Sequence, residues 1–155
     1  MSEGYTALDA NRFDAARTAF RRAAQLQAGS SEAASALQEV EAAATAYRLA
    51  TLKTKGLADE QAERWQEAVN VYEQARKIDP NVLFAREGLA RSEGRARLDK
   101  QFRAAIDEPG RLADIKVADA TEKLLLQARK ISPRGPVLAQ QIRALKYCCG
   151  RPIHP

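Results

Sequence analysis

The chain has 155 residues, of which 45% are hydrophobic and 29% charged, and its formal net charge is +5. This length is enough for one domain with a real core, and the abundance of Ala, Arg, Gln, Glu and Leu favours helices over strands. No apolar run approaches the roughly eighteen residues of a membrane span, and the first residues lack a hydrophobic signal core. The sequence therefore argues against membrane insertion by this segment and favours a cytoplasmic location.

The charge is unevenly distributed along the chain. Residues 1–80 hold ten Lys/Arg and twelve Asp/Glu, whereas residues 81–155 hold fifteen and eight. A basic second half of this kind is compatible with a nucleic-acid partner or with an acidic protein partner.

The first predicted helix with a clear beginning covers residues 12–28. Asn11 is placed to cap it, with Asp14 three residues later in a box-like arrangement. Gly29 is a suitable left-handed residue to end it, and Ser30 or Ser31 can cap the helix that follows.

The next predicted helix is long, from about residue 32 to residue 62. Its apolar stripe consists of Leu37, Val40, Ala44 and Tyr47. Gly56 costs on the order of 1 kcal/mol relative to Ala inside a helix, so this is where the helix would most readily kink or break.

Residues 64–80 read RWQEAVNVYEQARKIDP and predict the clearest amphipathic helix of the chain. Its apolar positions recur at spacings of three, four and seven residues, which places them on one face: Trp65, Ala68, Val69, Tyr72, Ala75 and Ile78. Pro80 ends the helix because it cannot continue the backbone hydrogen bonding.

Three further helices are predicted after Pro80. Asn81 is placed to cap a long helix over 82–107, which stops at Glu108-Pro109-Gly110. Asp114 is a plausible cap for a helix in 117–133, and Pro136 suits the first turn of a helix reaching residue 147. We expect residues 148–155 to form a frayed tail, in which the adjacent Cys148 and Cys149 cannot readily meet disulfide geometry with each other.

These segments repeat with a period of 52 or 53 residues. Five positions lie 52 residues before Trp65, Ala68, Tyr72, Ala75 and Ile78, and they are Phe13, Ala16, Phe20, Ala23 and Leu26. Gly4 precedes Gly56 by the same distance, and Leu125, Ala128, Ile131 and Pro133 follow Tyr72, Ala75, Ile78 and Pro80 by 53. The chain therefore predicts an array of similar helix pairs.

Residues 64–80 carry an aromatic residue, a small residue and a second aromatic residue, and they end in Asp-Pro. This pattern resembles the second helix of a tetratricopeptide repeat, and Gly56 lies at the family's small position in the first helix. The period exceeds the family's usual length of about 34 residues, and the surplus falls in the long helices. The resemblance implies a single all-α domain over residues 1–147, built as a solenoid or rod of long antiparallel helix hairpins. The last third is also loosely similar to bacterial proteins with extended repeats, some of them membrane-tethered, and we expect the chain to be part of a longer protein.

The same resemblance implies a non-catalytic scaffold or spacer that binds a segment of another protein. First helices line the concave face in that family, which here implies a groove formed by Lys53, Leu57, Glu60, Gln61, Phe84, Glu87, Arg91 and Arg95. Arg91 and Arg95 lie one helical turn apart, which favours an acidic or mixed segment as the ligand.

Other function classes are less well supported. The sequence contains no enzyme motif and no metal-ligand spacing, and it implies no cofactor. Residues 82–107 hold a row of basic side chains that could contact phosphates, but acidic residues four positions earlier suggest ion pairs within the helix, such as Glu87–Arg91 and Asp99–Arg103. Nucleic-acid binding, marked by steep salt dependence, and self-association through the ends of the array remain alternatives.

Overall fold

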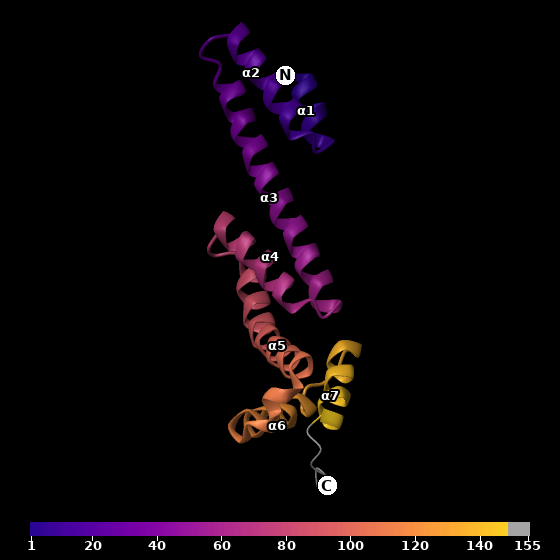
Figure 1. Ribbon diagram of the computed structural model, residues 1–155. Helices are drawn as coiled ribbons and strands as arrows, with labels where there is room; N and C mark the ends of the chain where they lie inside the picture. The colour runs from indigo at the N-terminus through magenta and orange to yellow at the C-terminus, as the bar shows by residue number, and fades with distance from the viewer. Residues whose placement is uncertain (149–155) are drawn as a thin grey trace. The chain divides into compact units, whose positions relative to one another are not determined.

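The computed structural model describes residues 1–148 and is all-α over that range, which confirms the predicted fold class (Figure 1). The helices are α1 (Ser2–Asp9), α2 (Phe13–Leu26), α3 (Ser31–Gln61), α4 (Trp65–Ile78), α5 (Leu83–Asp107), the 3-10 helix η1 (Pro109–Ala113), α6 (Ile115–Arg129) and α7 (Pro136–Cys148). The long helix α3 continues through Gly56 without a break. Most of the predicted tail, including Cys149 and His154, lies outside the described residues.

The chain divides into two compact units, Met1–Leu52 (unit 1) and the part from Lys53 onward (unit 2). Helix α3 contributes residues to both. The expectation of one domain over residues 1–147 stays a prediction, and each unit is described by itself below.

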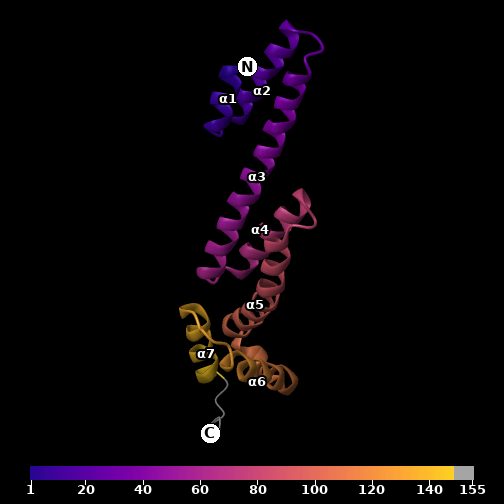
Figure 2. The same ribbon diagram turned by 180° about the vertical axis from the view of Figure 1, so that it is seen from behind.

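Unit 1 is built around Phe20 of α2, whose side chain is fully buried. In both views α1 and α2 lie side by side as a hairpin (Figures 1 and 2), and the core they share with α3 includes Ala7, Ala16, Ala36 and Val40. Gly4 lies against the Phe20 ring so closely that a Cβ there would be 2.5 Å from a ring carbon. The absence of a side chain at Gly4 is what allows the two helices of this hairpin to approach.

Unit 2 has two centres of packing. The first is Tyr72 of α4, which is 1% exposed and lies between Gly56 of α3 and Gly88 of α5. The second joins α5, α6 and α7, and its buried members include Phe102, Leu125, Leu138 and Leu145. This second cluster is what fixes α6 and α7 to the C-terminal half of α5.

The helix caps follow the predictions only in part. Ser30 Oγ accepts a hydrogen bond from Ala33 N at 3.3 Å, and Asp114 Oδ1 accepts from Lys116 N at 2.8 Å, as predicted. The predicted cap at Asn11 is wrong, because Arg12 is the N-cap residue and no side chain caps α2. The predicted cap at Asn81 is also wrong: α5 begins after Val82 without a side-chain cap.

The 52-residue repeat is matched by the backbone of the two turns that precede α2 and α4. Asn11 and Glu63 are both left-handed, with φ of 56° and 55°. The residue after each has nearly the same conformation, φ −91° and ψ 68° for Arg12 and φ −87° and ψ 69° for Arg64. In both turns that residue donates its N–H to the carbonyl five positions earlier at 2.8 Å. The two hairpins therefore share one turn geometry, with Gly4–Phe20 in one matching Gly56–Tyr72 in the other.

We expect Gly88→Ala to destabilise unit 2 although alanine is the better helix former. A Cβ at Gly88 would collide with the Tyr72 ring, and overpacking of this kind costs about 1 to 3 kcal/mol. Gly94→Ala on the same helix is the matched control, because a Cβ there meets nothing within 4 Å and should stabilise by about 0.5 to 1 kcal/mol. Urea denaturation of the two variants should shift the midpoint in opposite directions, and equal shifts would contradict the close approach of α4 and α5.

Candidate functional site

A groove in unit 2 brings together most of the predicted partner-binding residues. It has a volume of about 470 Å³ and is lined by Lys53, Leu57, Tyr72, Val82, Leu83, Phe84, Glu87 and Arg91. Helix α3 supplies the first two of these residues, α4 supplies Tyr72, and the start of α5 with the residue before it supplies the rest. Of the predicted positions, Lys53, Leu57, Phe84, Glu87 and Arg91 line the groove, whereas Glu60, Gln61 and Arg95 do not.

The groove presents apolar side chains to solvent. Leu57 is 39% exposed and Leu83 is 63% exposed, and the half-buried Phe84 ring packs edge-on against Tyr72 with centroids 6.4 Å apart. The predicted groove residues did not include Val82 and Leu83, because only positions expected on the concave face of the array were chosen from the start of α5. Exposed leucines beside an aromatic ring can be buried by an apolar ligand side chain.

Glu60 lies next to the groove and orients two of its residues. Its carboxylate accepts hydrogen bonds from Tyr72 Oη at 2.8 Å, from Arg91 at 3.1 and 3.3 Å, and from Ser92 Oγ at 3.3 Å. Burial, together with the bond to this carboxylate, raises the pKa of Tyr72 to about 12, so the phenol stays protonated and continues to donate. Glu60 is therefore a positioning residue that is held by the protein's own donors.

The ion pair expected between Glu87 and Arg91 is not formed. Arg91 pairs with Glu60 on α3 instead, and the hydrogen bond that it donates to Glu60 is the largest cause of the raised pKa of its guanidinium. Within the described chain, Glu87 and Lys53 make no ion pair and remain as free charges of opposite sign on the groove. The Asp99–Arg103 pair is confirmed, with Nε to Oδ2 at 2.8 Å.

Arg95 and Gln61 lie outside this groove. The Arg95 guanidinium lies over the Trp65 ring, 4.5 Å from its centroid, and pairs with Glu63 at 3.4 Å. Burial lowers the pKa of this guanidinium, against the opposing attraction of Glu63 and Asp99. Gln61 is exposed at the last position of α3. Arg95 is thus occupied within unit 2 and cannot assist Arg91 in holding a ligand without leaving Glu63.

Sequence analysis missed Glu63, which connects the α3–α4 turn to α7. Its side chain is 5% exposed, and its two carboxylate oxygens accept hydrogen bonds from Val137 N at 2.6 Å and Leu138 N at 3.2 Å. These are free N–H groups of the first turn of α7, where a negative charge is favoured. Gly135 packs against the same carboxylate, and a Cβ there would overlap it. A contact between residues more than 70 positions apart cannot be predicted from a local sequence pattern.

The described chain contains no group of His, Cys, Asp and Glu side chains that could hold a metal ion. None of the helices in residues 1–148 is both long and apolar enough to cross a membrane. In comparisons with known proteins, no family model, no curated protein and no solved structure matches this chain.

Proposed function

We propose that this protein is a non-catalytic interaction module of the tetratricopeptide type, which binds an extended segment of another protein in the groove between α3, α4 and α5. The observation that supports it is the groove itself, where the exposed side chains of Leu57 and Leu83 share the lining with the unpaired charges of Lys53 and Glu87. We place this interaction in the cytoplasm, as the sequence suggests.

The chemistry of the groove indicates what the ligand should contain. Two apolar side chains can cover Leu57, Leu83 and Phe84, which removes exposed apolar surface from water. An acidic side chain near Lys53 and a basic one near Glu87 would complete the match, because both charges are free to pair. The preferred ligand is thus an apolar segment of mixed charge and not a uniformly acidic one.

The structure gives less support to nucleic-acid binding than the row of basic residues in the sequence did. Arg91, Arg95 and Arg103 of α5 are each paired with a carboxylate, so their charges are partly compensated before any phosphate arrives. A ligand held mainly by apolar contact should also show weak salt dependence, whereas phosphate contacts give a steep one.

The groove is tested with peptides selected from a random displayed library on the full chain. We expect Leu57→Ser with Leu83→Ser to weaken the selected peptides by about tenfold or more, since these are the central apolar contacts. Leu126→Ser is the matched control, because Leu126 on α6 is 49% exposed and lies outside the groove. Circular dichroism should give the same thermal midpoint for all three proteins.

Two results would contradict this proposal. One is selected peptides that bind the groove variant and the parent equally. The other is a parent that yields no peptide but retains a mixed-sequence oligonucleotide, with affinity falling steeply between low and moderate salt; this would favour the basic surface instead.

A further inference from the structure

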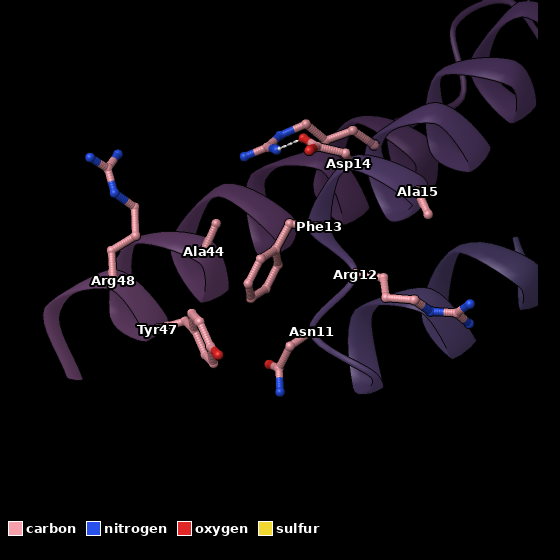
Figure 3. A pocket seen from close by; sticks show the side chains of 9 residues that line it. Asn11, Arg12, Phe13, Asp14, Ala15, Ala44, Tyr47 and Arg48 are labelled. Carbon is pink, nitrogen blue, oxygen red and sulfur yellow. Dashed lines mark hydrogen bonds and ion pairs between the residues drawn. The ribbon is translucent and has the colours of Figure 1, made fainter. Parts of the chain in front are cut away.

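A second pocket, in unit 1, is formed where the α1–α2 turn meets α3, and we call it the Asn11 pocket. It has a volume of about 550 Å³ and is lined by Asn11, Arg12, Phe13, Asp14, Ala15, Arg17, Ala44, Tyr47 and Arg48. Figure 3 shows Phe13 and Tyr47 next to each other with Asn11 close by, and the two rings have centroids 5.6 Å apart. Tyr47 is 52% exposed, so its ring is available to a ligand.

The Asn11 pocket has a counterpart in unit 2, because the two turns share one backbone geometry. At the 52-residue spacing, Asn11, Phe13, Ala44 and Tyr47 correspond to Glu63, Trp65, Ala96 and Asp99. In unit 2 the counterpart is covered by the beginning of α7. Val137 N and Leu138 N donate to Glu63, and Gln141 Nε2 donates to Asp99 Oδ1 at 2.6 Å.

In unit 1 no helix of that unit covers the corresponding position. The side chains there keep one feature that holds α7 in unit 2, a hydrogen-bond acceptor at the position of Glu63. The Asn11 carboxamide has an oxygen that can accept from a backbone N–H, as the Glu63 carboxylate does. The Phe13 and Tyr47 rings supply an apolar wall.

The charge of the Asn11 pocket differs from that of its counterpart. Arg17 is held by Glu41 at 2.6 Å and by Asp14 at 2.7 Å, but Arg12 and Arg48 are exposed and have no partner in the described chain. In unit 2 the corresponding Arg64 is tied to Asp59 at 2.6 Å. Two free guanidinium groups favour a ligand with carboxylates, and acidic side chains are common in the first turn of helices.

We propose that the Asn11 pocket is a docking site for the beginning of a helix from a partner protein, with apolar residues in its first turn and acidic residues beside them. The partner's first free N–H groups bond to Asn11, its apolar residues cover Phe13 and Tyr47, and its carboxylates meet Arg12 and Arg48. This site shares no residue with the groove of unit 2, so an experiment can refute one proposal without refuting the other.

The test uses a stapled helical peptide with the sequence of residues 135–146, in which the positions of Ala139 and Gln140 carry glutamate. Its binding to the full chain is measured by fluorescence anisotropy. Asn11→Gly keeps the left-handed turn but removes the acceptor, and Arg48→Glu reverses a charge. We expect each variant to bind the peptide about fivefold more weakly or worse. A peptide N-methylated at its third and fourth residues, the positions of Val137 and Leu138, should show the same loss.

Amide chemical shifts locate the peptide on the protein. Saturable shifts at residues 11–13 and 44–48 are the expected result. Shifts confined to residues 63–65 would mean that the peptide only competes with α7 for Glu63, and would overturn the proposal. Equal binding by the N-methylated peptide, or no binding by the parent up to millimolar peptide, would overturn it as well.

Discussion

Replacing Tyr72 by alanine should lower the free energy of unfolding of unit 2 by about 3 to 5 kcal/mol. The ring is 1% exposed and lies between Gly56 and Gly88, which have no side chains to fill the space it leaves. The substitution also removes the Tyr72 Oη donor from the partly buried Glu60 carboxylate. Trp65 is the only tryptophan of the chain and lies in unit 2, so its fluorescence in a urea titration reports this unit directly.

Tyr72→Phe is the control for this experiment. It keeps the ring and loses only the hydrogen bond, so the expected cost is about 1 to 2 kcal/mol. An alanine variant with an unchanged midpoint would mean that Tyr72 is not packed between α3 and α5, and the repeat alignment built on it would be wrong.

Replacing Glu63 by alanine should detach the beginning of α7 and cost about 2 to 4 kcal/mol. The substitution leaves the N–H groups of Val137 and Leu138 without their acceptor and leaves the largely buried Arg95 guanidinium without its carboxylate. Hydrogen exchange is the direct measurement: the amides of residues 137 and 138 should lose protection before those of α4.

Asn11→Ala is the matched control, because Asn11 has the same left-handed backbone but caps no helix within unit 1. Its cost should stay at about 1 kcal/mol, which is what alanine loses in a left-handed backbone conformation. If Glu63→Ala cost no more than Asn11→Ala, the carboxylate would not be what holds α7.

The groove shows how far a family pattern can locate a site. The resemblance to tetratricopeptide repeats implied that Leu57 and Phe84 lie on helices facing one space, and the structure puts both on the groove. The same pattern could not predict that Arg91 and Arg95, which lie one turn apart, take different partners. Arg91 is drawn to Glu60, while Arg95 stacks on Trp65 and pairs with Glu63. The choice of partner depends on which carboxylates neighbouring helices bring within reach, and that is not encoded in the spacing of one helix.

The sequence by itself determined the longer helices and the repeat, whereas the short α1 and the 3-10 helix η1 were not predicted. The 3.6-residue period of apolar positions is a local property, so the order of helices could be predicted, and the 52-residue recurrence predicted that α2 and α4 are alike. Only the tertiary structure decided the contacts between distant segments. Glu63 meets the first turn of α7 because packing of α5 against α7 brings them together, and no short-range rule links residues so far apart. Gly56 was predicted to be a small position of the repeat, but the role of Gly88 on the other side of Tyr72 was not predicted, because it depends on three helices meeting in space.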